Sequence, residues 1–102
     1  MTKVTLLFFA GCPNWRAVDR QLRELAGELG FEFERREIAS FEEAERVEFA
    51  GSPTVLIDAR DPFPSDGPSG LACRRYDTDH GPQGAPPAAA LRDALRRATA
   101  GA

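Results

Sequence analysis

In the first third of the chain the order of apolar and polar residues changes from a strand pattern to a helical pattern and then returns to a strand pattern. Residues 3–9 are apolar on both faces, which predicts a buried central strand. In residues 14–29 the apolar positions recur every three or four residues, which predicts a helix, and Gly30 is placed to end it. Residues 31–34 alternate, as in a strand with one covered face. Such strand–helix–strand units are almost always right-handed and parallel.

The rest of the chain predicts two more strands and two more helices. Ser40 and Glu43 have the spacing of a capping box, which begins a helix that ends near Phe49. The other predicted segments are a strand over 54–58, a long loop over 59–70, a strand over 71–76, a turn over 77–84 and a helix opened by Pro86-Pro87. We therefore expect an α/β fold of order βαβαββα, with a four-stranded mixed sheet flanked by three helices.

Length and composition narrow the possible functions. The 102 residues fit a single domain, 1–102. The net charge of −3 gives no electrostatic case for binding nucleic acid or an anionic membrane. The longest apolar run, residues 4–10, is far shorter than the roughly 20 residues of a membrane helix and lacks the flanks of a signal peptide. We expect a cytoplasmic protein, in which two cysteines argue against a structural disulfide scaffold.

Cys12 is the strongest candidate for chemistry. It stands between the first predicted strand and the first predicted helix, and Pro13 suits the first helical position. Unpaired N–H groups and the dipole at a helix start stabilise an anion, and the thiolate is the reactive form of cysteine. The sequence thus predicts a nucleophilic Cys12 with a lowered pKa. The alternative is an inert, buried cysteine.

Two short motifs resemble the thioredoxin-like superfamily. Cys12-Pro13-Asn14-Trp15 falls where that family has Cys-x-x-Cys, and Gly51-Ser52-Pro53-Thr54 falls where it has a cis-proline loop. The resemblance covers roughly residues 3–98. Small bacterial proteins of this kind carry thioredoxin-like or alkylmercury-lyase-like labels. The chain departs from the family at Trp15, which replaces the second cysteine and removes the local dithiol.

The resemblance implies a catalytic site and a substrate surface. Cys12 is the expected nucleophile, Cys73 is a candidate resolving thiol, and Trp15, Ser52 and Pro53 are the expected substrate-binding residues. The family context implies that the bond before Pro53 is cis, which would leave the Ser52 backbone open to an extended, thiol-bearing partner. A direct Cys12–Cys73 bond needs Cα atoms within about 7 Å. A Cys73 in the middle of the fourth strand would be too far away, and a packed strand cysteine is the alternative.

Three functions remain open at this point. The first is thiol–disulfide exchange by Cys12, with a thiol or disulfide of a protein or small molecule as partner. The second is a non-redox binding module that uses the groove between Cys12 and Pro53. The third is binding or lysis chemistry on soft metals such as mercury, with Cys12 and Cys73 as the thiols and Asp58 or Asp77 as the acid. A related alternative is a soft three-ligand metal site formed by Cys12, Cys73 and His80. We expect no cofactor, no resident metal, no nucleic acid and no membrane partner, and the oligomeric state stays open.

Overall fold

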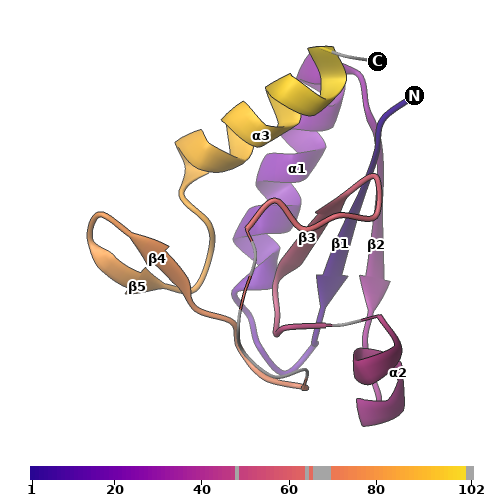
Figure 1. The fold of residues 1–102 in the computed structure, drawn as a ribbon, viewed down its shortest axis with the longest axis vertical. Coiled ribbons are helices and arrows are strands. Elements are labelled where there is room, and N and C mark those ends of the chain that lie inside the picture. The colour runs from indigo at the N-terminus through magenta and orange to yellow at the C-terminus, as the bar shows by residue number, and fades with distance from the viewer. Residues whose placement is uncertain (48, 64, 66–69, 101–102) are drawn as a thin grey trace.

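A computed structural model describes residues 1–47, 49–63, 65 and 70–100 of the chain. Three helices and five strands follow one another in the order βαβαβββα (Figure 1). Their bounds are β1 Lys3–Phe8, α1 Trp15–Leu29, β2 Glu32–Glu37, α2 Phe41–Arg46, β3 Thr54–Ile57, β4 Tyr76–Thr78, β5 Gly81–Gln83 and α3 Ala88–Ala100.

The main sheet has three strands in the order β2-β1-β3. The prediction of a central first strand is confirmed, because β1 pairs in parallel with β2 and antiparallel with β3. In this register Leu6 lies between Arg35 on one side and Val55 on the other. A strand paired on both edges and covered on both faces requires a continuous apolar run, and β1 has one.

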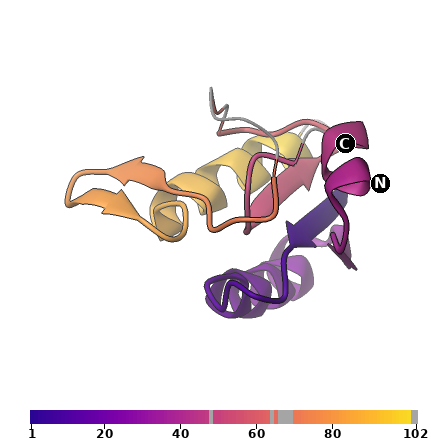
Figure 2. The ribbon, with the colours of Figure 1, turned by 90° about the horizontal axis from the view of Figure 1, so that it is seen from below.

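Helices cover both faces of this sheet (Figure 2). On one face α1 and α3 pack together over alternate residues of β1 and β3, with a core that includes Val4, Leu6, Val18, Leu22, Phe31, Val55, Leu91 and Leu95. The opposite face carries a smaller core formed by Leu7, Ile38, Ala44 and Phe49, to which α2 contributes. The alternation of β1 side chains between these two cores fixes which face each helix covers.

The predicted end of the first helix and the predicted cap of the second are confirmed, but α2 ends at Arg46 and not near Phe49 as predicted. Gly30 ends α1 in the left-handed conformation, with φ 77°, and its N–H donates to the carbonyl of Ala26. Ser40 caps α2 by accepting from the N–H of Glu43 at 3.1 Å, while the Glu43 carboxylate accepts from the N–H of Ala39. Within the part of the chain that the structure describes, no helix is long and apolar enough to cross a lipid bilayer.

The predicted four-stranded sheet is wrong. Residues 71–75 belong to no strand, and the predicted turn over 77–84 contains most of a separate hairpin, β4–β5, in which Tyr76 pairs with Gln83. Local turn chemistry explains the hairpin: the Thr78 hydroxyl accepts from the N–H of His80 and donates to the carbonyl of Gly81. The segment before it forms one isolated parallel bridge, between Cys73 and Ser52 in the loop before β3, and does not extend the main sheet.

Gly51 allows this segment to approach the loop before β3. Its φ is +111°, and a Cβ built there would lie 2.9 Å from the Cβ and 3.0 Å from the Cα of Arg74. Both the backbone conformation and the space therefore require glycine.

We predict that Gly51→Ala lowers the free energy of unfolding by about 1–3 kcal/mol, because it combines a strained backbone with a collision against Arg74. Gly27→Ala is the matched control: it lies within α1 with no atom within 4 Å of the added methyl group, and should raise stability by about 0.5–1 kcal/mol. Urea unfolding of both variants measures the difference. A Gly51→Ala protein as stable as the parent would contradict the close approach.

Candidate functional site

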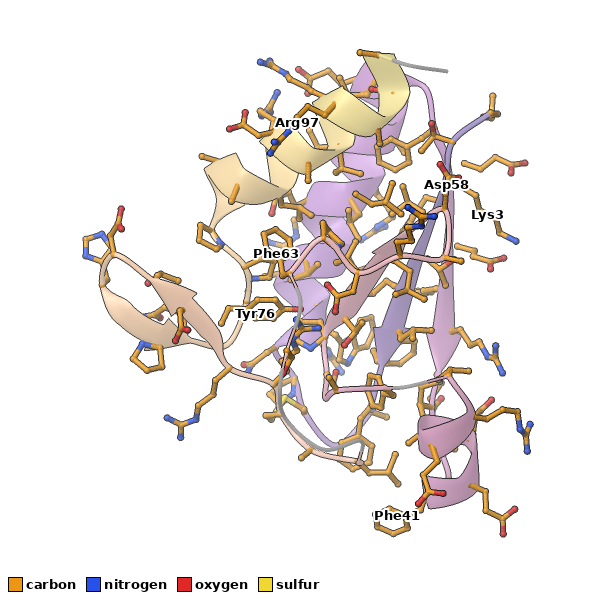
Figure 3. All side chains as sticks on the ribbon, viewed as in Figure 1. Lys3, Phe41, Asp58, Phe63, Tyr76 and Arg97 are labelled. Carbon is orange, nitrogen blue, oxygen red and sulfur yellow. A yellow bond between two sulfur atoms is a disulfide. The ribbon has the colours of Figure 1, made fainter. Side chains whose placement is uncertain are left out.

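A disulfide joins the two cysteines of the chain. The Cα atoms of Cys12 and Cys73 are 5.6 Å apart, within the range that a disulfide requires, although the residues are 61 positions apart in sequence. The bond lies at the end of the sheet where β1 leads into α1 (Figure 3). Its two ends differ in accessibility, because Cys12 is 0% exposed while Cys73 is an exposed residue. The question that the sequence left open is thereby answered: the two cysteines pair.

Cys12 is fixed between β1 and the first turn of α1. Its N–H donates to the carbonyl of Phe9 at 3.0 Å, and its sulfur lies 3.7 Å from the Ser52 carbonyl oxygen. The first turn of α1 contains no acidic residue, and the Asn14 side chain forms no capping hydrogen bond. The positive end of the helix dipole thus faces this region without a carboxylate from the first turn to oppose it.

The loop before β3 holds the segment that carries Cys73. The Ser52–Pro53 bond is cis, as the resemblance implied. The N–H of Ser52 donates to the carbonyl of Ala72 at 2.8 Å, and the carbonyl of Ser52 accepts from the N–H of Arg74 at 2.9 Å. The backbone groups that we expected to be open to a partner are therefore occupied by the chain's own residues on either side of Cys73.

Arg74 anchors this segment from within the protein. It is only 4% exposed, and one guanidinium nitrogen donates to the Asp61 carboxylate at 2.6 Å and to the Thr54 hydroxyl at 3.2 Å. A second nitrogen donates to the carbonyl of Phe63. The arginine thus ties Asp61 and Phe63 to β3. Part of the predicted loop over 59–70 lies outside the described residues. The sequence analysis did not single out Arg74 as a buried anchor.

Tyr76, two residues after Arg74, also holds this segment against the loop before β3. Its hydroxyl donates to the Pro53 carbonyl at 2.5 Å. Its ring forms a T-shaped contact with the ring of Phe63, with the two centroids 5.8 Å apart. The Arg74 guanidinium lies 4.4 Å from the centre of the Tyr76 ring. Burial raises the pKa of Tyr76 well above its ordinary value; the Arg74 charge opposes this shift and the Asp61 carboxylate adds to it. Sequence reasoning did not single out Tyr76 for this role.

Trp15 is half-buried at the first residue of α1. Its ring stacks on Phe8 with centroids 4.3 Å apart, and the guanidinium groups of Arg16 and Arg35 each lie 5.6 Å from its centre. These contacts hold the ring against β1 and leave part of it accessible near the start of the helix.

The other sequence candidates lie elsewhere. His80 is exposed in the turn between β4 and β5. Asp58 accepts from the N–H of Lys3, at the end of the sheet away from the disulfide (Figure 3). Asp77 is exposed in β4. Among the described residues no three His, Cys, Asp or Glu side chains are grouped as a set that could hold a metal ion.

Comparisons with known proteins do not identify the chain. No protein family, no curated protein and no solved structure matches it. The site must therefore be interpreted from its own geometry.

We predict an abnormal alkaline titration for Tyr76, the only tyrosine. Because its folded pKa is raised, its contribution to stability is fully present below the unfolded pKa of about 10 and is lost as the pH rises through the folded value. Tyrosinate absorbance should appear only with the loss of native circular dichroism, whereas the denatured chain should titrate near pH ~10. Ordinary titration of the folded protein would contradict the burial of this hydroxyl.

Proposed function

We propose that this protein carries out thiol–disulfide exchange, with Cys12 and Cys73 as its redox couple, in a domain related to the thioredoxin-like superfamily. The observation that carries the proposal is the unequal accessibility of the bond: a buried sulfur on Cys12 is joined to an exposed Cys73 beside the start of a helix. Exchange requires an accessible sulfur to be attacked and a stabilised thiolate to leave. The exposure of Cys73 and the helix start next to Cys12 support these two requirements.

The first step joins an external thiol to Cys73. The thiolate of the partner attacks the Cys73 sulfur, a partner–Cys73 disulfide forms, and the Cys12–Cys73 bond breaks with its electron pair on Cys12. Exposure favours Cys73 as the point of attack, although sequence reasoning assigned the nucleophilic role to Cys12. In the reverse direction the reduced Cys73 thiolate attacks a partner disulfide, and Cys12 then releases the partner.

The leaving sulfur is well placed to carry charge. Cys12 precedes α1, where the N–H groups and the dipole of the first turn favour a thiolate. We propose that the reduced Cys12 thiol has a pKa below the ordinary ~8.5. When Cys12 is protonated, its thiol can donate to the Ser52 carbonyl oxygen, which lies 3.7 Å away.

A second partner thiol completes reduction. It attacks the partner sulfur of the mixed disulfide, releases the oxidised partner as a disulfide, and leaves Cys73 as a thiolate that takes up a proton. Two partner thiols are oxidised and the protein disulfide is reduced by two electrons. We propose that the partner lies against the accessible part of Trp15 during these steps, while Ser52 and Pro53, which are buried, hold the segment that carries Cys73 in place.

We predict that the oxidised protein, treated briefly with mercaptoethanol at neutral pH and quenched with acid, carries the adduct on Cys73 and a free thiol on Cys12. Peptide mass spectrometry locates both. Cys12→Ser, treated instead with the disulfide of mercaptoethanol, should form a mixed disulfide on Cys73 with release of one mercaptoethanol. Because the introduced serine cannot expel the partner, this adduct should persist until a thiol is added.

Two results would count against this mechanism. An adduct located on Cys12 would reverse the direction of attack. A disulfide that resists the thiol in the folded protein, and reacts only after denaturation, would mean that the bond serves as a structural cross-link.

A further inference from the structure

A cleft lies beside the exposed end of the disulfide. It consists of two adjoining cavities of about 320 and 460 Å³ that share Asn14, Gln83 and Gly84 as lining residues. The smaller one contains Cys73 in its wall, and the larger one follows the outer side of α1 along Arg16. Each cavity has the volume of a typical small-molecule site.

The two sides of the cleft are in direct contact where the cavities meet. A Cβ built on Gly84 would lie 2.4 Å from the side-chain nitrogen of Asn14, so the chain after β5 packs directly on that amide. A side chain at position 84 would require the Asn14 amide to move. The two polar side chains that line both cavities therefore come from different elements: Asn14 precedes α1, and Gln83 ends β5.

The charge of the cleft is opposite to that of the whole protein. The chain has a net charge of −3, yet the described lining of both cavities contains no Asp or Glu. Arg75 lines the smaller cavity, and Arg16 and Arg20 line the larger one. Among the described residues none of these three forms an ion pair, and Asp77, the acid nearest to Arg75 in sequence, does not pair with it. Arg74 also lines the smaller cavity, but Asp61 neutralises it.

We infer that this cleft binds the anionic part of a small thiol, or of its disulfide, and so selects acidic low-molecular-weight thiols as the exchange partners. The inference rests on the proposed function. A carboxylate or sulfonate held by Arg75 or Arg16 places the attached sulfur toward Cys73, and raises the local concentration of the reacting thiolate. The bonds that form and break are those of the exchange described above.

Three small thiols that differ mainly in charge test the inference. Mercaptoethanesulfonate is an anion, mercaptoethanol is neutral and cysteamine is a cation. At low ionic strength, with rates expressed per thiolate, we expect the sulfonate to reduce the disulfide roughly three- to tenfold faster than mercaptoethanol, and cysteamine to be slowest. The advantage should shrink as salt is added, because exposed charges are screened.

Variants of the cleft arginines test whether these side chains cause the difference in rate between the three thiols. Arg16→Gln combined with Arg75→Gln should bring the three rates together, because it removes the charges that favour the sulfonate over neutral mercaptoethanol. Arg97→Gln, an exposed change on α3 outside the cleft, is the charge-matched control for one substitution and should keep the parent's selectivity.

Different results of these rate measurements would contradict the anionic cleft and the exchange function. Equal rates for the three thiols at low salt, or selectivity that survives in the double variant, would overturn the anionic cleft while leaving disulfide exchange intact. A folded protein that none of the three thiols reduces would overturn the exchange function itself, and the selectivity with it.

Discussion

The site depends on the docking of residues 72–76 against the loop before β3. Two backbone hydrogen bonds to Ser52, the buried side chain of Arg74 and the Tyr76 hydroxyl hold this segment in place. Gly51 permits the approach because any side chain there would meet Arg74. The two cysteines are 61 positions apart in the sequence, and this docking places Cys73 beside Cys12. The anchor is thus the structural origin of the disulfide.

The same docking makes the two sulfurs chemically unequal. Cys12 lies under the segment, with 0% of its surface exposed, while Cys73 is carried on the outer side. A bond that is buried at one end and open at the other directs an incoming thiol to one sulfur. The segment also occupies the Ser52 backbone, so a partner that uses those hydrogen-bonding groups must displace it.

Sequence patterns predicted the local structure well because short-range effects determine it. The apolar run of β1, the left-handed Gly30 and the Ser40 cap all follow from neighbouring residues. The fourth strand was predicted wrongly, because the interactions of Arg74 with Asp61 and Phe63 are non-local and leave no periodic signal. The pairing of Cys73 stayed open for the same reason. Cys12 was singled out by its place between a strand and a helix, and Ser52 and Pro53 by the family resemblance. The structure brings Cys12 next to Ser52, while the roles of all three residues stay predictions.

The reduction potential of the Cys12–Cys73 bond tests the central claim most directly. The oxidised protein is equilibrated with thiol–disulfide buffers of graded potential, and the fraction of free thiol is counted after alkylation. Because one end of the bond is exposed, an exchangeable couple should have a potential above about −300 mV, with the protein still folded when reduced. A potential well below about −300 mV, or unfolding on reduction, would identify a structural cross-link and contradict the account.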